Sequence, residues 1–148
     1  MSNMMEIPFS TTLLVRDTCL CLHVQRAARA LARLFDESLR PVGLTNGQFS
    51  LMMSLNRPEP PAMGPVAALL AMDQTTLTAA LKPLVRKGWV TVTPNPRDKR
   101  ERLLSLTGAG KTVLASALPI WERTHALLEG KLPDGNANRL RRDLQALA

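Results

Sequence analysis

A dense group of cations near residue 100 is the part of this chain with the most readable chemistry. The segment PNPRDKRE joins two short β-rich runs, WVTVT and RLLSL, and is therefore expected to be the tip of a β-hairpin. The cations at and beside this tip are Arg97, Lys99, Arg100 and Arg102, the last of which begins RLLSL. Such side chains bind phosphate oxygens, and Asp98 is expected to hold an arginine in place as its ion-pair partner. The alternative is a solvated charged loop, because most charge runs are just that.

The run DQTTLTAALKPLVRKG predicts a helix directly before this hairpin. Its expected buried stripe consists of Leu77, Leu81, Leu84 and Val85. Asp73 is expected to cap the start of the helix by accepting from free backbone N–H groups, and Gly88 to end it in the left-handed conformation. Pro83 removes one helical hydrogen bond, so it is expected to kink the helix or to end its regular part.

A different face of the same helix is polar. It carries Gln74, Thr75, Thr76, Thr78 and Lys82. Threonine suits thymine methyls and base edges, and glutamine and lysine can address adenine or guanine, although an ordinary solvated helix face would have the same composition. A polar-faced helix followed at once by a basic hairpin is what a winged helix-turn-helix needs to bind duplex DNA. The helix would enter the major groove while the hairpin reached the flanking phosphates or the minor groove.

Composition agrees with one domain and an anionic partner. The chain has 148 residues, 45% of them hydrophobic, with a formal net charge of +7 and a pI of about 10.4. This surplus favours nucleic acid or an anionic membrane face, and a merely soluble basic protein is the alternative. No apolar stretch approaches the roughly 20 residues that a membrane-spanning helix requires. The start, MSNMMEIPFSTTLLVRD, lacks the features of an export signal, so reduced thiols and a cytoplasmic location are expected.

The fold class expected from the remaining patterns is mainly α with a small β-hairpin wing. After a short polar arm, apolar residues recur with helical spacing from Leu20 to Leu39, and Pro41 and Gly43 end that helix. A capping box of Thr45 and Gln48 predicts the start of the next helix. The connector NRPEPPAMG leads to a short helix, PVAALLAM, whose N-cap and first turn are expected at Gly64 and Pro65.

The C-terminal part predicts two more helices. Thr107 is expected to cap a long helix that Pro119 interrupts, and ANRLRRDLQAL follows the break LPDGN. Their apolar positions would find cover most easily against another subunit; they are Val113, Leu114, Leu118, Trp121, Leu127, Leu128, Leu140, Leu144 and Leu147. We therefore expect a single domain over residues 1–148. In it, N- and C-terminal dimerisation helices, at about 12–40 and 107–148, flank a winged helix-turn-helix lobe at about 44–106.

This constellation resembles the multiple antibiotic resistance regulator (MarR) family over nearly the whole chain. The matching runs are LTNGQFSLM at Leu44–Met52, DQTTLTAALKPLVRKGWV at Asp73–Val90 and NPRDKRERLLSLTGAGK at Asn95–Lys111. The resemblance implies a homodimer that represses transcription from a palindromic operator until a small molecule or an oxidant releases it. The wing role would pass to Asp98 and Arg100, and an unknown effector would bind between the first two helices and the DNA-reading lobe.

The two cysteines leave the signal open. By the same resemblance, Cys21 aligns with the sensor cysteine of organic hydroperoxide regulators, although the tyrosines of that site are replaced by Gln25 and Phe35. One hypothesis is redox sensing by Cys21, with Cys19 as the weaker candidate. The alternative is that Cys21 is a buried small apolar side chain. Cys19 and His23 lie one helical turn apart, but two ligands do not make a metal site.

Other classes of function have weaker support. No metal, cofactor or enzymatic activity is expected, because GAGKT at 108–112 lacks the earlier glycine of a phosphate-binding loop and no catalytic constellation stands out. A protein–protein adaptor that uses a winged helix without DNA is the competing hypothesis from a different class.

Overall fold

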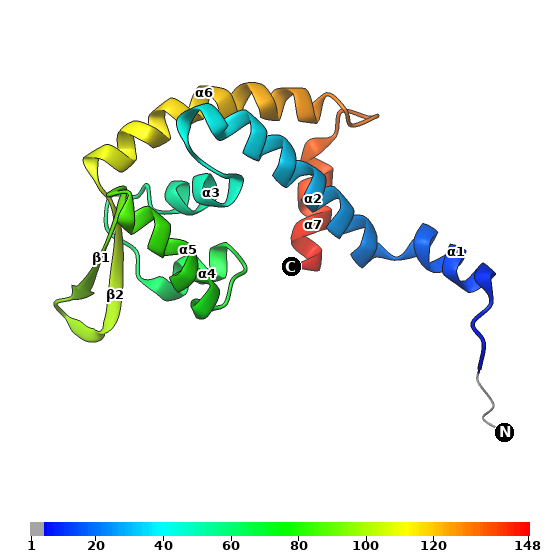
Figure 1. Ribbon diagram of the computed structural model, residues 1–148, viewed down its shortest axis with the longest axis horizontal. Coiled ribbons are helices and arrows are strands. Elements are labelled where there is room, and N and C mark those ends of the chain that lie inside the picture. The colour runs from blue at the N-terminus through cyan, green and yellow to red at the C-terminus, as the bar shows by residue number, and fades with distance from the viewer. Residues whose placement is uncertain (1–4) are drawn as a thin grey trace. The chain divides into compact units, whose positions relative to one another are not determined.

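The computed structural model describes residues 5–148, so the first four residues of the expected polar arm lie outside the description. The chain divides into two compact units, residues 1–34 and residues 35–148. No helix in the described part of the chain is long and apolar enough to cross a bilayer. The fold is mainly helical with one two-stranded antiparallel sheet, as the sequence predicts (Figure 1).

The first unit contains two helices where the sequence analysis expected an arm and one helix. Helix α1 spans Phe9–Thr18, and α2 spans Leu20–Leu39, continuing into the second unit. Cys19 separates the two helices with an extended backbone (φ −67°, ψ 109°). Pro8 precedes α1, and its carbonyl accepts a hydrogen bond from the Thr11 N–H at 3.0 Å. The arm is therefore helical from Phe9, although α1 has no buried residue.

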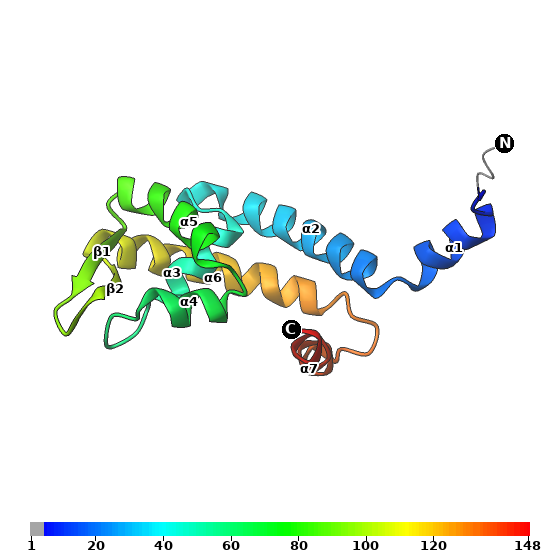
Figure 2. The same cartoon turned by 90° about the horizontal axis from the view of Figure 1, so that it is seen from below.

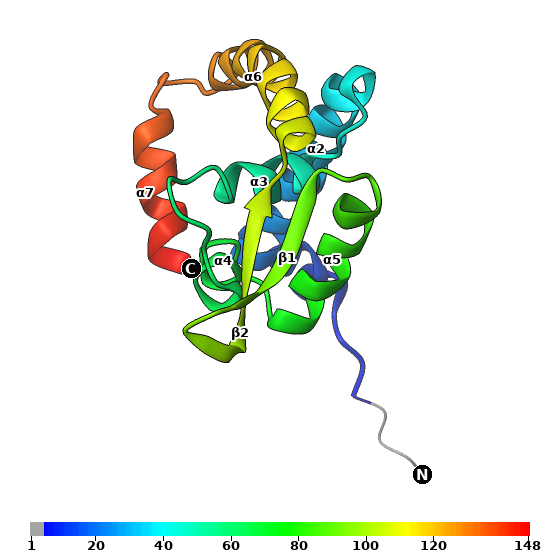
Figure 3. The same cartoon turned by 90° about the vertical axis from the view of Figure 1, so that its left-hand side faces the viewer.

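The second unit holds the other elements, which Figures 2 and 3 show from two sides. In chain order they are the end of α2, η1 (Arg40–Val42), α3 (Asn46–Ser54), α4 (Met63–Leu69), α5 (Gln74–Arg86), β1 (Val90–Asn95), β2 (Asp98–Leu106), α6 (Gly108–Glu129) and α7 (Ala137–Leu147). Their most completely buried large side chains are Leu39, Leu51, Met52, Leu77, Leu84, Leu104, Val66 and Val90. These side chains come from α2 to β2, so one apolar core holds the whole helix-turn-helix and its hairpin.

The hairpin has longer strands than the sequence predicts. Val90 pairs with Leu106, and the pairing continues to Asn95 and Asp98 at the far end, with an irregularity after Pro94. Lys99 and Arg100, which were expected in the loop, therefore lie on β2 itself together with Arg102, and only Arg97 precedes the strand. The connector before α4 also pairs with this strand: Ala62 forms an isolated bridge with Leu103, and the Leu104 N–H donates to the Pro61 carbonyl at 2.9 Å.

Helix ends in the lobe are fixed by side-chain and backbone hydrogen bonds. The capping box of Thr45 and Gln48 is confirmed, with the two N–H···O bonds at 3.1 and 3.2 Å. Gly88 adopts φ +75° after α5, and the Trp89 N–H donates to the Leu84 carbonyl at 3.0 Å, which is a Schellman ending.

The end of α4 has the same hydrogen-bonding pattern without a glycine. The Met72 N–H donates to the Ala67 carbonyl at 2.9 Å, and Ala71 takes the left-handed position with φ +53°. Its Cβ strains this turn, which leads directly into α5. The start of α4 differs from the prediction: its N-cap is Ala62, and Pro65 lies within the first turn, where a missing N–H leaves no intrahelical bond unmade.

Neither proline inside a long helix ends it. Helix α5 continues past Pro83 to Arg86, and α6 continues past Pro119 to Glu129, so the expected interruption at Pro119 is wrong. A proline costs a helix about 3 kcal/mol, while a buried leucine contributes about 1.5–3 kcal/mol. Apolar residues on both sides of each proline pack on the core, and this packing holds the helices together.

Two further expectations about burial are corrected. Val85 is 43% exposed, so it does not belong to the buried stripe of α5, whereas Leu77, Leu81 and Leu84 do. Leu114 is 5% exposed and lies in the core of its own chain, so it needs no second subunit for cover. The remaining leucines of the C-terminal helices that are exposed are Leu118, Leu127, Leu140, Leu144 and Leu147.

Gly110 is expected to be irreplaceable at the start of α6. A Cβ on Gly110 would lie 2.2 Å from the Trp89 carbonyl oxygen, so Gly110→Ala must push backbone apart. We expect Gly110→Ala to lower the free energy of unfolding by about 1–3 kcal/mol in urea denaturation. Gly108→Ala is the matched control, because its Cβ would meet nothing within 4 Å. Equal stability of the two variants would contradict the close approach.

Asp36 is expected to make stability depend on pH. Its carboxylate accepts from the Asn46 backbone N–H at 2.7 Å and side-chain Nδ2 at 2.8 Å, and these bonds, first the backbone one, lower the Asp36 pKa. A lowered folded-state pKa gives stability that is complete above the unfolded value, about 4, and is lost as the pH falls through the folded pKa.

Asp36→Asn should therefore reduce stability at pH 7 by about 1 kcal/mol, with the difference from wild type shrinking as the pH falls below the unfolded value of about 4 and through the lowered folded-state pKa. Denaturant titrations at several pH values measure this difference. Glu37→Gln, at the exposed neighbouring position, should show no such trend. If wild type and Asp36→Asn differed in unfolding free energy by the same amount at every pH, Asp36 would not be the source of the pH dependence.

Candidate nucleic-acid interface

An open groove of about 880 Å³ lies between α5 and the wing, the name used here for the hairpin β1–β2. Its lining residues are Met63, Gly64, Gln74, Thr78, Leu81, Lys82, Val85, Arg86, Val92, Asp98, Arg100, Glu101 and Arg102. Apolar side chains from α4, α5 and β1 contribute to the lining together with polar and charged side chains from α5 and β2. The two segments that the sequence analysis singled out therefore border one concave surface.

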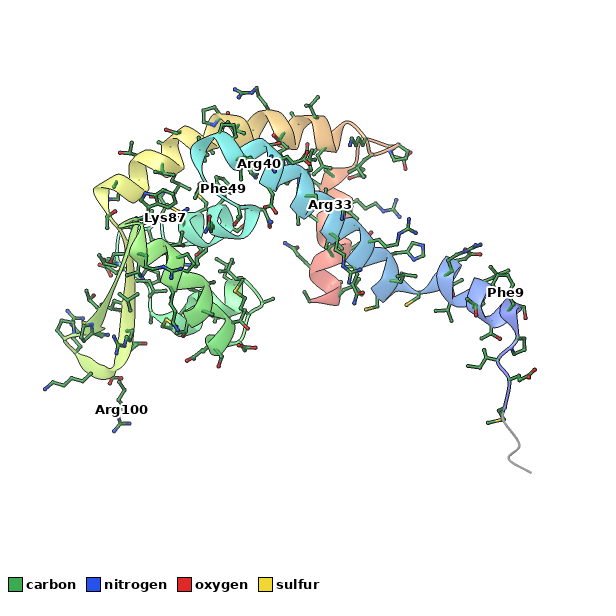
Figure 4. The ribbon with its side chains drawn as sticks, viewed as in Figure 1. Phe9, Arg33, Arg40, Phe49, Lys87 and Arg100 are labelled. Carbon is green, nitrogen blue, oxygen red and sulfur yellow. The ribbon has the colours of Figure 1, made fainter. Side chains whose placement is uncertain are left out.

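The groove collects part of the expected site. From the polar face of α5 it includes Gln74, Thr78 and Lys82, and from the wing it includes Asp98, Arg100 and Arg102. The other expected residues are all exposed but do not line the groove; they are Thr75, Thr76, Arg97 and Lys99. Figure 4 shows the Arg100 side chain standing out from the wing.

The start of α5 is held by the predicted cap. The Asp73 carboxylate accepts from the Thr76 N–H at 2.7 Å, and hydrogen bonding from Thr76 lowers the Asp73 pKa. The Thr78 hydroxyl donates to the Gln74 carbonyl at 2.8 Å, which leaves its oxygen lone pairs and its methyl group facing outward. The first turns of α5 thus present amide, hydroxyl and methyl groups from a fixed backbone.

Carboxylates in the wing shape its backbone. Asp98 was expected to pair with an arginine side chain, but in the described part of the chain it makes no ion pair. Its carboxylate instead accepts from the Arg100 backbone N–H at 3.1 Å. At the turn, the Asn95 side chain donates to the Glu101 carboxylate at 2.9 Å and accepts from the Arg97 N–H at 3.0 Å. The cations beside them are therefore not neutralised by these acids.

The result is a surface whose cations outnumber its two carboxylates, Asp98 and Glu101, and are not paired with them. The described residues include no ion pair made by any cation of α5 or the wing, namely Lys82, Arg86, Arg97, Lys99, Arg100 and Arg102. Arg86 was missed by the sequence analysis, although it follows Lys82 by four residues and so shares its face of the helix. Such a surface attracts polyanions and suits phosphate contacts.

A joint at Thr107 sets α5 and the wing relative to α6. The Thr107 hydroxyl donates to the Gly88 carbonyl at 2.6 Å and accepts from the Gly110 N–H at 3.0 Å. Beside it, the Lys87 ammonium lies 4.6 Å from the centroid of the Trp89 ring and donates to the Gly43 carbonyl at 3.3 Å. The C-terminal end of α5 is thereby hydrogen-bonded to the turn at Gly43 and to Thr107 at the start of α6.

The cysteine and histidine candidates lie elsewhere, near the start of α2. Cys21 is exposed in the single chain, and its sulfur accepts from the Gln25 side-chain amide at 3.3 Å. Cys19 is half-buried, and the His23 Nδ1 lies 2.7 Å from its carbonyl oxygen instead of its sulfur. No group of three metal-binding side chains occurs among the described residues.

His125 has structural partners on α6. Its ring stacks on Trp121 with the centroids 4.7 Å apart, and its Nδ1 lies 3.4 Å from the Glu129 carboxylate. The same carboxylate accepts two hydrogen bonds from Arg141, at 2.9 and 3.0 Å, which connects α7 to the end of α6. His125 therefore belongs to a structural cluster.

Sequence comparison identifies a family for the lobe that contains the groove. Residues 44–101 match the model of the MarR family. The multiple antibiotic resistance protein MarR of Escherichia coli K12 is 37% identical over 81 residues, which cover 55% of this chain and 56% of that protein. Matches to the first three curated relatives span between 55% and 61% of their lengths.

Structural comparison extends the likeness over most of the chain. The transcriptional regulator MosR of M. tuberculosis, in complex with DNA, is 36% identical with a TM-score of 0.80, over 87% of this chain and 92% of that one. A mutant MarR from E. coli complexed with operator DNA is 27% identical with a TM-score of 0.80, over 91% of this chain and 97% of that one. With its polar-faced α5, its basic wing and these matches, the chain belongs to the MarR family.

Proposed function

We propose that this chain is a sequence-specific DNA-binding transcription regulator that acts as a homodimeric repressor. The observation that carries the proposal is the groove in which the polar face of α5 meets the unpaired cations of the wing. A purely electrostatic binder needs no ordered polar helix face. An adaptor without DNA gains nothing from a cationic wing whose two carboxylates accept hydrogen bonds from the Arg100 N–H and the Asn95 side chain instead of pairing with the cations.

The polar face of α5 and the cations of the wing would make different contributions to binding. Gln74, Thr75, Thr76, Thr78 and Lys82 would contact base edges in the major groove and supply discrimination. The wing cations Arg97, Lys99, Arg100 and Arg102 would contact phosphates and supply affinity that falls steeply with salt. Asp98 would act indirectly, because it shapes the backbone from which Arg100 projects.

A homodimer would place two copies of this surface at the spacing of two DNA half-sites. Leucines on α6 and α7 and apolar side chains on α1 are exposed in the single chain, which is the pattern expected of helices that pack on a partner. Two copies of α5 about 34 Å apart would match a pseudo-palindromic operator. The structures of MosR and of the E. coli MarR mutant both contain DNA, which supports DNA binding by this chain as well. A regulator of this kind would act in the cytoplasm, where the chromosome lies.

The releasing signal has two candidates within this function. A small-molecule effector follows from family membership. Thiol oxidation is favoured by one specific observation: Cys21 is exposed, and its sulfur already accepts an N–H···S hydrogen bond, which also suits a thiolate. Loss of operator binding on treatment with peroxide, abolished in Cys21→Ser and retained in Cys19→Ser, would establish the second candidate.

In-vitro selection from random duplex DNA tests the proposal as a whole. We expect the bound pool to contain a pseudo-palindrome with half-sites about one helical turn apart. Thr75→Ala should then relax the preference at one position of each half-site, at a cost of about 1–3 kcal/mol for the preferred base. A pool without enrichment, with binding that follows ionic strength alone, would reduce the protein to a non-specific binder.

Arg100→Ala is expected to act on every sequence alike. Loss of a phosphate contact should weaken binding to the selected operator and to random duplex by a similar factor, and the slope of log K against log salt should fall by about 1. Fluorescence anisotropy at several salt concentrations measures both quantities. Arg123→Ala on α6 removes the same charge from an exposed position outside the groove and should change neither slope nor affinity. Identical slopes for the two variants would remove the wing from the interface.

A further inference from the structure

A second cationic surface lies on α2, within the first unit. His23, Arg26, Arg29 and Arg33 surround Ala27 and Ala30 and border a shallow hollow of about 590 Å³. Figure 4 labels Arg33 on this helix. We call these three arginines, the histidine and the two alanines the arginine face. Each of the six residues is exposed, and the apolar residues of the same helix, such as Val24 and Leu31, fall on a different side of it.

The arginine face carries three positive charges, and the nearest carboxylates on the same helix, Asp36 and Glu37, lie one turn beyond Arg33 without forming an ion pair with it. No aspartate or glutamate occurs between Thr18 and Phe35. Among the described residues, none of the three arginines makes an ion pair. Like charges on adjacent turns of one helix destabilise it, so the cluster lowers the stability of the free protein. An anion that bound there would relieve this repulsion.

The geometry selects a compact ligand. A rise of 1.5 Å per residue places Arg26 and Arg33 about 10 Å apart along the helix, with Arg29 between them. Guanidinium groups bind phosphoryl oxygens through two parallel N–H···O bonds. Ala27 and Ala30 leave room above the backbone, and the hollow has the size of a small-molecule site. His23 is held through Nδ1 by the Cys19 carbonyl oxygen, so only its Nε2 remains free.

We propose that the arginine face binds a small anion that contains two or more linked phosphoryl groups. This site goes beyond the proposed operator binding, because it uses none of the residues of α5 or the wing. A duplex would offer phosphates over a much longer path than the roughly 10 Å that the three arginines cover. A nucleoside polyphosphate and inorganic polyphosphate share the chemistry that this face recognises.

Calorimetric titration of the full-length protein with inorganic tripolyphosphate tests the proposal. The triple variant Arg26→Ala, Arg29→Ala, Arg33→Ala should bind at least about tenfold more weakly than wild type, since it loses all three charge-assisted contacts. Alanine favours helix, so α2 should persist. The control triple Arg123→Ala, Arg139→Ala, Arg142→Ala removes the same charge from exposed positions of α6 and α7 and should retain binding within about twofold.

Three outcomes would overturn the proposal. Equal weakening in both triple variants would show attraction to net charge alone, and unchanged binding in the α2 variant would show that the ligand sits elsewhere. Weaker binding of duplex DNA by the α2 variant, measured without tripolyphosphate, would assign the face to DNA. Titration with ATP in place of tripolyphosphate distinguishes the two kinds of ligand. Tighter binding of ATP would indicate a nucleotide whose base adds contacts, and equal or weaker binding would indicate the bare phosphate chain.

A measurement on wild-type protein guards against a variant that fails to fold. Phenylglyoxal modifies accessible arginines, and tripolyphosphate should protect Arg26, Arg29 and Arg33 more strongly than Arg139 or Arg142. Equal protection at all five positions would contradict the site. Failure to modify the α2 arginines even without ligand would mean that a second copy of the chain covers them, and this too would overturn the proposal.

Discussion

The hydroxyl group of Thr107 is the interaction on which the arrangement of the DNA-facing elements depends. It donates to the last carbonyl of the turn after α5 and accepts from the first turn of α6, while the Thr107 N–H donates to the Trp89 carbonyl at 3.0 Å. That carbonyl also lies against Gly110, where no side chain fits. The end of α5, the first residues of β1 and the start of α6 are thus fixed at one point, and the groove takes its shape from it.

The two carboxylates of the wing accept hydrogen bonds from neutral groups instead of forming ion pairs. Carboxylates beside cations would ordinarily form ion pairs and weaken any attraction to phosphate. Here Asp98 and Glu101 accept from the Arg100 N–H and the Asn95 side chain, so their oxygens stabilise the turn. The guanidinium groups stay available. The wing therefore combines a hydrogen-bonded turn with exposed, unpaired cations, which suits contact with a phosphate chain whose local geometry varies.

Local chemistry made much of this fold and site predictable. Caps at Thr45, Asp73 and Thr107 follow from side chains that satisfy N–H groups three residues away, so the residue types and their spacing are enough to predict them. Long-range packing decided what the sequence could not show. The helix through Pro119 continues because its neighbours are held on the core. For Asp98 a different cause applies: its carboxylate accepts from the N–H two residues further on, a local bond that competes with ion pairing and that the pattern of charges does not reveal.

The left-handed conformation of Ala71 means that a single substitution at this position can raise the stability of the protein. An alanine in that conformation costs about 1 kcal/mol or more relative to its preferred backbone, and it sits in the turn between the two helices of the helix-turn-helix. A single base change converts any alanine codon to a glycine codon, which relieves the strain at a smaller entropic cost. A more stable neighbour is therefore one mutational step away, and that reserve could offset destabilising substitutions on α5 through which a lineage acquires a new operator preference.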